Sequence, residues 1–244
     1  MTSDINPRDS IQPLVSTDGP VLLLGGARTA DTQGVLRDML AIGALGQAPV
    51  VAADGGAGLA IAAGLAPAAV IGDFDSLSDA DRARLDPSVL HRVAEQETTD
   101  FDKALRAVRA PVVVGVGFHG ARLDHQLAAM TVLARHPDRP CILVGPEDIV
   151  CLCPPRLRLQ AEVGSWLSLY PLGPVSGCSD GLEWPIDGLE LTPADRVGTS
   201  NRVSGPVQLE MGAPLMLLIL PRPALRPLLE ALSRSDARWP ARAG

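Results

Sequence analysis

The sequence predicts an α/β domain with a mainly parallel sheet, followed by an all-β, sandwich-like domain. Two observations predict this order. Up to about residue 150, short apolar runs alternate with stretches of helical spacing, which is typical of βαβ units around a parallel sheet. After that point, short strand-like runs are separated by Gly and Pro, which favours a small antiparallel sandwich or barrel. We therefore expect one domain over residues 1–150 and a second, with a C-terminal tail, over residues 151–244.

In the first part, each expected strand is a short aliphatic run followed by Gly or Asp. Ligands bind at the carboxyl ends of strands in parallel sheets, and glycines and acidic residues recur at these ends here. Ser78 is the expected N-cap of one helix, and Thr98 or Thr99 of the next. The expected strands are 21–24, 50–53, 68–71, 112–116 and 141–144, and the expected helices are 35–45, 58–63, 78–85, 99–108 and 121–134.

In the second part, the expected strands are short and closely spaced, and a helical stretch precedes the tail. The expected strands are 157–159, 165–170, 189–191, 207–211 and 215–220, and the expected helix is 224–232.

Composition excludes several classes of protein. The chain has 244 residues and a net charge of −7, which argues against a general nucleic-acid binder. Residues 1–20 are polar and lack the apolar core of a signal peptide, and no apolar run approaches the ~20 residues of a membrane-spanning helix. The four cysteines lack zinc-site spacing. We expect a cytoplasmic protein without nucleic-acid or membrane partners.

The first acidic cluster is Gly72-Asp73-Phe74-Asp75-Ser76, directly after an apolar strand. Two carboxylates separated by one residue face one cation if the chain bends there, and Mg²⁺ takes oxygen ligands of this kind. A solvated turn explains the same pattern without any function, although the preceding strand and Gly72 favour a metal site.

Two further clusters have the same ambiguity. Asp54 is followed by Gly55 and Gly56, and glycines let the backbone approach a phosphate or ribose closely. An ordinary βα turn has the same residues. Asp100 and Lys103 lie three apart in a helix, so they suit a metal and a phosphate, or simply a surface ion pair on a capped helix.

The fourth cluster runs from Gly117 to His125 and leads from a strand into a helix. Arg122 is a suitable donor to polyphosphate near a helix N-terminus, and Asp124 could orient it. A surface Arg–Asp pair fits this segment equally well.

Taken together and in order, these segments resemble thiamine pyrophosphokinase. The resemblance extends over about residues 21–220. It rests on ADGGA (53–57), IGDFDSL (71–77), QETTDFDKAL (96–105), GFHGARLDHQLA (117–128), GLEWP (181–185) and GTSN (198–201). One departure is Arg202 after Asn201, where the family commonly has an acidic residue.

The resemblance implies a homodimer with its sites at the subunit interface. The implied reaction transfers the pyrophosphoryl group of ATP to the hydroxyl of thiamine, giving thiamine diphosphate and AMP, with Mg²⁺. The implied metal ligands are Asp73, Asp75 and Asp100, with Asp54 beside them in the catalytic site. The implied ATP-binding residues are Gly55, Gly56, Gln96, Lys103, Arg122 and Asp124, and the implied thiamine-binding residues are Trp184, Ser200 and Asn201.

Three alternatives are weighed against this interpretation. D-x-D after a strand is also the nucleophile signature of haloacid-dehalogenase-type phosphatases, but Gly72 interrupts the apolar run and no clear Asp-Asp pair follows. A related pyrophosphokinase that acts on a pterin alcohol would share the metal and ATP residues. A non-catalytic nucleotide-sensing module would bind ATP without producing AMP. Among only seven aromatic residues, Trp184 is the best candidate to stack on a thiamine ring.

Overall fold

One continuous sheet organises the protein, which is described by a computed structural model covering residues 12–27, 29, 31–95, 97–120 and 122–242. Six strands pair in parallel in the order β8-β7-β2-β3-β4-β5. Their bounds are β2 (Val21–Leu24), β3 (Val50–Ala53), β4 (Ala69–Gly72), β5 (Leu90–Arg92), β7 (Val113–Val116) and β8 (Cys141–Val144). The order of the strands reverses beside β2, so the carboxyl ends of these strands form the edge where a ligand is expected.

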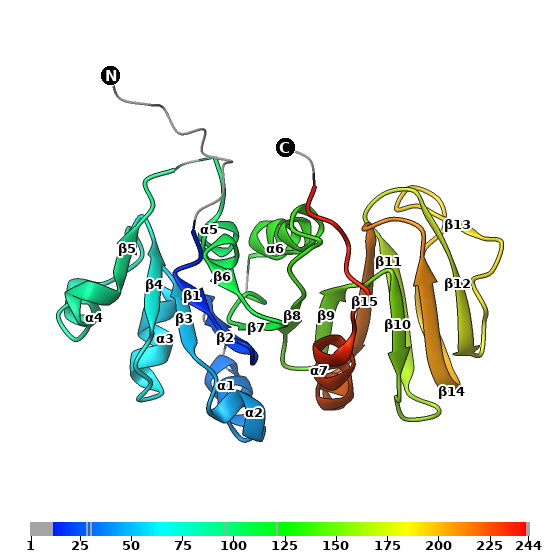
Figure 1. The fold of residues 1–244 in the computed structure, drawn as a ribbon, viewed down its shortest axis with the longest axis horizontal. Coiled ribbons are helices and arrows are strands. Elements are labelled where there is room, and N and C mark those ends of the chain that lie inside the picture. Colours follow the sequence, from blue (N-terminus) through cyan, green and yellow to red (C-terminus); the bar gives the residue numbers. More distant parts are fainter. Residues whose placement is uncertain (1–11, 28, 30, 96, 121, 243–244) are drawn as a thin grey trace.

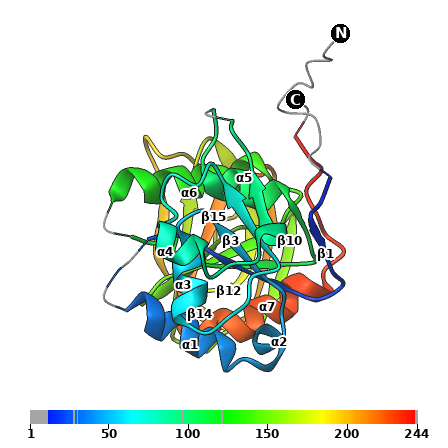
Figure 2. The same cartoon turned by 90° about the vertical axis from the view of Figure 1, so that its left-hand side faces the viewer.

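Helices cover both faces of this part of the sheet (Figures 1 and 2). They are α1 (Thr32–Leu40), α2 (Gly43–Gly46), α3 (Gly56–Ala62), α4 (Asp79–Arg82), α5 (Asp100–Arg106) and α6 (Leu123–Arg135). Strand β2 shows why helices are needed on both faces of the sheet. Successive side chains of a strand point to opposite faces, and on β2 both sets are apolar. Val21 and Leu23 pack in one core cluster with α5 and α6, while Leu22 and Leu24 pack in another with α1 and α3.

Beyond β8 the pairing becomes antiparallel. Strand β9 (Asp148–Leu152) pairs with β8 on one side and with β15 on the other, and the order continues as β15-β11-β14-β12-β13. The remaining bounds are β10 (Arg156–Leu159), β11 (Trp166–Pro171), β12 (Val175–Leu182), β13 (Glu190–Leu191), β14 (Gly198–Met211), β15 (Met216–Pro221) and α7 (Leu225–Arg234). Two short 3₁₀ turns lie at Pro87–Val89 and Arg222–Ala224, and β1 (Val15–Ser16) pairs with β6 (Val108–Arg109) in a separate two-stranded sheet.

The apolar core continues from the first part of the chain into the second. One buried cluster joins Leu36 and Met39 of α1 to Leu157 of β10 and Leu228 of α7. In Figure 1, β10 to β14 lie at the opposite end of the molecule from β4 and β5. Among the described residues, no helix is long and apolar enough to span a membrane.

The expected succession of an α/β part and a β-rich part is confirmed, with differences in detail. The expected helix 35–45 is two helices, because Ile42 takes an extended conformation between α1 and α2. Ser78 and Thr99 each accept a backbone hydrogen bond as N-caps, as expected. The expected boundary at residue 150 lies inside β9, and the division into residues 1–150 and 151–244 stays a prediction.

Candidate active site

Three carboxylates converge at the carboxyl ends of β3 and β4. Asp54 follows β3, while Asp73 and Asp75 follow β4. One oxygen from each of these side chains lies within 4.8 Å of the others. Because neighbouring parallel strands end at the same edge of a sheet, two segments that are distant in the sequence supply one acidic cluster.

Asp54 is the buried member of the cluster, with 2% of its surface exposed. Its Oδ2 accepts a hydrogen bond from the backbone N–H of Ser76 at 3.1 Å, whereas its buried Oδ1 has no hydrogen-bond partner among the described residues. Burial raises the pKa of Asp54 to about 6, and the neighbouring carboxyl groups of Asp75 and Asp100 add to the rise.

The backbone of the acidic cluster is strained at Asp54 (φ 42°) and Phe74 (φ 69°). Ser200 on β14 (φ 60°) is the other positive φ angle among the described non-glycine residues, and all three lie within the motifs of the resemblance. A bulky residue such as Phe rarely adopts this conformation, and such strain concentrates at functional sites. Phe74 packs against a small buried cluster that includes Leu77, and the Arg82 guanidinium lies 5.4 Å from its ring centre.

Helix α5 brings Asp100 and Lys103 to the same edge. The Lys103 ammonium lies 3.1 Å from Asp100 Oδ1, and the lysine side chain is only 2% exposed, so a surface ion pair is the wrong interpretation. Burial raises the pKa of Asp100, Lys103 opposes the rise, and the charges of Asp73 and Asp75 add to it. Lys103 is the only lysine among the 244 residues, whose other basic side chains are arginines and histidines.

Gly72 allows Asp54 and Asp100 to approach each other. A Cβ at this position would lie 2.8 Å from the Asp54 Cβ and 3.2 Å from Asp100 Oδ1. The glycine is therefore needed because a side chain here would separate the two carboxyl groups.

The donor set fits a hard divalent cation. Mg²⁺ prefers carboxylate oxygens and water, and these residues offer several such oxygens at one strand edge. The buried Asp54 Oδ1 without a partner also fits, because a buried carboxylate oxygen is costly unless it meets a donor or a cation.

A cavity of about 500 Å³ lies beside the carboxyl ends of β2 and β3, and Gly55 lines it together with Gly26 and Arg84. Gly56 has a packing role, because a Cβ there would lie 2.1 Å from the carbonyl oxygen of Leu24. These glycines let α3 begin directly against the neighbouring strand.

Arg122 and Asp124 begin α6 as an exposed pair. Arg122 Nε donates a hydrogen bond to Asp124 Oδ1 at 3.2 Å, and Arg122 Nη2 donates one to Asp124 Oδ2 at 2.6 Å. The two side chains are 69% and 64% exposed, so solvent screens their attraction and both are accessible to a ligand. Gln96, also expected near ATP, lies outside the described residues.

Trp184, Ser200 and Asn201 lie together at the β12–β14 end of the sheet. Asn201 is buried, and its side chain donates a hydrogen bond to the carbonyl of Trp184 at 2.6 Å and accepts one from the Trp184 N–H at 3.2 Å. The Ser200 N–H donates to the Ser168 hydroxyl at 2.9 Å. Asn201 therefore anchors the loop that presents the 53% exposed Trp184 to solvent.

Within one chain, these residues are not brought together with the acidic cluster. Six strands separate β14 from β3 in the sheet, in the order β11, β15, β9, β8, β7 and β2. At about 4.8 Å between adjacent strands, the seven steps from β14 to β3 amount to about 34 Å along the sheet.

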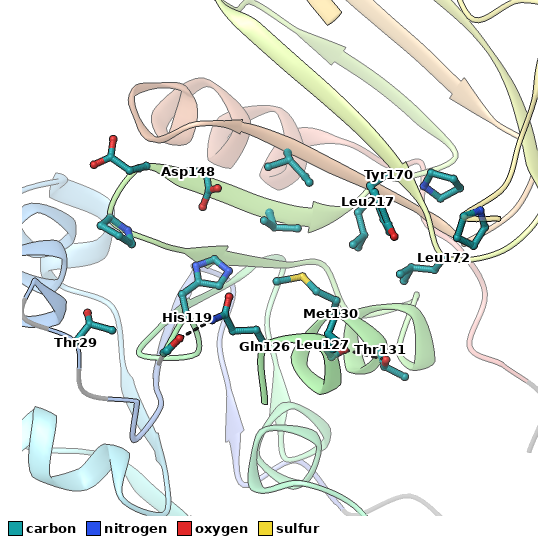
Figure 3. A pocket seen from close by; sticks show the side chains of 17 residues that line it. Thr29, His119, Gln126, Leu127, Met130, Thr131, Asp148, Tyr170, Leu172 and Leu217 are labelled. Carbon is teal, nitrogen blue, oxygen red and sulfur yellow. Dashed lines mark hydrogen bonds between the residues drawn. The ribbon is translucent and has the colours of Figure 1, made fainter. Parts of the chain in front are cut away.

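A second cavity, of about 640 Å³, lies between α6 and strands β9, β15 and β11 and was not predicted from the sequence (Figure 3). His119 and Gln126 lie at its polar end, and Met130, Tyr170 and Leu217 line its apolar side. Burial lowers the pKa of His119, so its imidazole favours the neutral form.

Comparisons with known proteins agree with the resemblance. A model described as "Thiamin pyrophosphokinase, catalytic domain" matches residues 46–143, and one described as "Thiamin pyrophosphokinase, vitamin B1 binding domain" matches residues 156–216. Thiamine pyrophosphokinase 1 of Arabidopsis thaliana is 28% identical over 159 residues, which cover 56% of this chain and 58% of that protein. The match thus spans less than two thirds of this relative's length.

Solved structures share the fold. Thiamine pyrophosphokinase from Bacillus subtilis superposes with a TM-score of 0.67 at 19% identity, covering 83% of this chain and 98% of that chain. Thiamin pyrophosphokinase from Candida albicans gives a TM-score of 0.67 at 17% identity, covering 89% and 97%. The two family models together match more than half of the chain, and the acidic strand ends lie inside the first. The chain belongs to the thiamine pyrophosphokinase family.

Proposed function

We propose that the protein transfers the pyrophosphoryl group of ATP to the hydroxyl of thiamine, giving thiamine diphosphate and AMP. The observation that carries this proposal is the convergence of Asp54, Asp73 and Asp75 beside the ion pair of Asp100 with the buried Lys103. Transfer of a phosphoryl-type group needs positioning and charge neutralisation above all, and this arrangement is suited to both.

The residues have distinct proposed roles. Asp73, Asp75 and Asp100 would hold Mg²⁺, with Asp54 beside them; the ion would offset charge on the β- and γ-phosphates. Lys103 would add positive charge from the protein. Gly55 lines the cavity at the carboxyl ends of β2 and β3, which supports a place for the nucleotide there. The full proposed ATP-binding set is Gly55, Gly56, Gln96, Lys103, Arg122 and Asp124.

In the proposed step, the hydroxyl oxygen of thiamine forms a bond to the β-phosphorus, and the bond from that phosphorus to the α–β bridging oxygen breaks. AMP leaves with the bridging oxygen, and a carboxylate of the acidic cluster accepts the alcohol proton. Thiamine is a cation, so the acidic character of the site also suits its recognition.

The direct test incubates purified protein with thiamine, ATP and Mg²⁺ and identifies the products by chromatography. Thiamine diphosphate with AMP is the expected result. ADP with thiamine monophosphate would contradict pyrophosphoryl transfer. A pterin alcohol in place of thiamine tests for the related pterin pyrophosphokinase activity. Release of phosphate from p-nitrophenyl phosphate, without thiamine or ATP, tests for phosphatase activity. The family models support neither of these activities.

We further propose a homodimer in which Trp184, Ser200 and Asn201 of one protomer complete the acidic site of the other. The six strands that separate these groups within one chain support this arrangement. The proposed setting is the cytoplasm, without nucleic-acid or membrane partners, and residues 1–150 and 151–244 would be the ATP- and thiamine-binding domains.

Mixing two impaired variants tests the shared site, at a thiamine concentration well below the KM of the Trp184→Ala variant. Asp73→Asn and Trp184→Ala impair different halves of the proposed site, so mixed dimers contain one site with neither substitution. We expect the rate after the two proteins are unfolded and refolded together to rise several-fold above the mean rate of the two proteins refolded alone. Absence of recovery in dimers shown to be mixed by mass spectrometry would contradict the proposal.

A further inference from the structure

Asp102 is a buried carboxylate without a role in the proposed reaction. It belongs to α5, two residues after Asp100, and only 3% of its side chain is exposed. Because an α-helix turns about 100° per residue, Asp100 and Asp102 lie on roughly opposite sides of α5. Asp102 therefore faces away from the acidic cluster while sharing its helix.

Basic side chains of α5, of α6 and of the residue after α6 lie close to Asp102. Arg106 Nε of the same helix lies 2.8 Å from Oδ1, and His136 Nε2, directly after α6, lies 3.2 Å from the same oxygen. The more exposed Arg135 approaches Oδ2 at 3.9 Å. The carboxylate thus joins the middle of α5 to the end of α6.

Arg106 extends the network to the segment before α5. Its Nη2 atom lies 2.7 Å from Glu95 Oε2 and donates a hydrogen bond to the Thr98 hydroxyl at 3.2 Å. The Thr98 hydroxyl in turn donates a hydrogen bond to Glu95 Oε1 at 2.6 Å. Thr99, the next residue, caps α5. The network therefore fixes the segment that leads to Asp100 as well as the helix that carries it.

Burial of such a network is weak evidence for a gain in stability, because desolvation offsets the attraction between the charges. Its geometric effect is more specific, since the groups have few alternative arrangements in which each charge keeps a partner. We propose that Asp102 is a positioning residue, which acts through Arg106 and His136 to hold α5 so that Asp100 and Lys103 meet the carboxylates of β3 and β4. This inference rests on the proposed function.

The test compares Asp102→Asn with the wild type by two independent measurements. The first is the Kd for Mn²⁺, measured by electron paramagnetic resonance without substrates; the second is steady-state kinetics with thiamine, ATP and Mg²⁺. We expect the Kd for Mn²⁺ to rise about tenfold, the size typical of lost support behind metal ligands. We expect kcat to fall while the KM for thiamine stays unchanged, because none of the proposed thiamine-binding residues belongs to α5 or α6.

Leu228→Ala is the matched control, because Leu228 of α7 is fully buried in a core cluster that contains no residue of α5. All proteins are compared below their melting transitions. Arg106→Lys, which keeps the charge but loses the planar guanidinium, serves as a second variant if Asp102→Asn does not fold.

Normal Mn²⁺ affinity and normal kcat in a folded network variant would overturn the positioning role, as would an equal effect of Leu228→Ala. A wild-type protein without thiamine pyrophosphokinase activity would instead refute the proposed function. The comparison of Mn²⁺ affinities would still decide the role of Asp102 in that case.

Discussion

The ammonium group of Lys103 is buried 3.1 Å from Asp100 Oδ1, one helical turn further along α5. Lys103 is the only lysine in the sequence, and the other 20 residues of the Lys and Arg total are arginine. A lysine at this one position indicates that the site needs a compact ammonium group. We expect Lys103→Arg to lose activity although it keeps the charge, because the longer, planar guanidinium does not fit the buried position. Steady-state kinetics should show a fall in kcat on the order of 100-fold. Activity near that of the wild type would contradict the steric argument, and Arg109→Lys on the exposed strand β6 is the control for the reverse exchange.

Asp73→Asn and Asp75→Asn should each remove most activity. Each substitution takes one anionic oxygen donor from the cluster, so the Mg²⁺ concentration needed for half-maximal rate should rise and kcat should fall on the order of 100-fold. Asp79→Asn, an exposed carboxylate in the first turn of α4, is the control. Near-normal rates at saturating Mg²⁺ in both variants would refute the metal site.

Asp54 should make the stability of the metal-free protein depend on pH. The pKa is raised from 3.8 to about 6, so the folded state binds more protons than the unfolded chain between these values. The free energy of unfolding therefore falls as pH rises through this window, by about 3 kcal/mol at most. Asp54→Asn should remove this loss, and Asn tolerates the positive φ at this position.

Chemical denaturation in the presence of a chelator measures the effect. Asp54→Asn should be more stable than the wild type at pH 8, and the difference should shrink toward pH 4. Mg²⁺ should stabilise the wild type more than the variant, since the ion needs the ionised carboxylate. A variant that is less stable than the wild type at pH 8 would show that the surrounding protein groups stabilise the ionised Asp54 carboxylate without a metal ion.

Gly72→Ala tests the geometry of the cluster without altering its charge. The added methyl group would meet the Asp54 Cβ at 2.8 Å and Asp100 Oδ1 at 3.2 Å, so the two carboxyl groups must move apart. We expect weaker Mg²⁺ binding by calorimetry and a lower kcat. Gly43→Ala is the control, because nothing lies within 4 Å of a Cβ there. Unchanged Mg²⁺ binding would mean that the site tolerates this displacement.

Trp184→Ala should raise the KM for thiamine about tenfold, the effect of one lost aromatic contact, and leave the KM for ATP unchanged. Trp166→Ala is a suitable comparison, because Trp166 is also partly exposed, on β11. If both substitutions have the same effect, or if ATP binding changes instead, Trp184 does not contact thiamine.

The α/β part was predictable because its buried strands are short aliphatic runs with clear boundaries. Strand β5 (Leu90–Arg92) was missed, since a partly exposed edge strand with His and Arg lacks that pattern. Only residues 207–211 of β14 were expected. The half around Asn201 is polar and contains glycines, and its extended conformation depends on pairing with β11 and β12.

The residues of the candidate site could be predicted from motifs, whereas their burial and their spatial neighbours could not. The spacing of Asp73 and Asp75 indicated a shared cation, but the approach of Asp54 depends on which strands are neighbours. Burial of Lys103 could not be inferred from its own helix, because the covering residues come from other elements. The Asp102 network was missed for the same reason, since its partners are 4 to 34 residues away in the sequence.

Because Lys103 is the only lysine, its acylation can report how often α5 separates from the sheet in the folded protein. Lys103 is 2% exposed, so acylating reagents reach its ε-amino group only when α5 separates from the sheet. Because no other side chain carries a primary amine, the rate at which one ε-acyl adduct appears in a mass spectrum measures the opening of this helix alone. Slower labelling in the presence of ATP and Mg²⁺ would measure how strongly ligands hold the site closed.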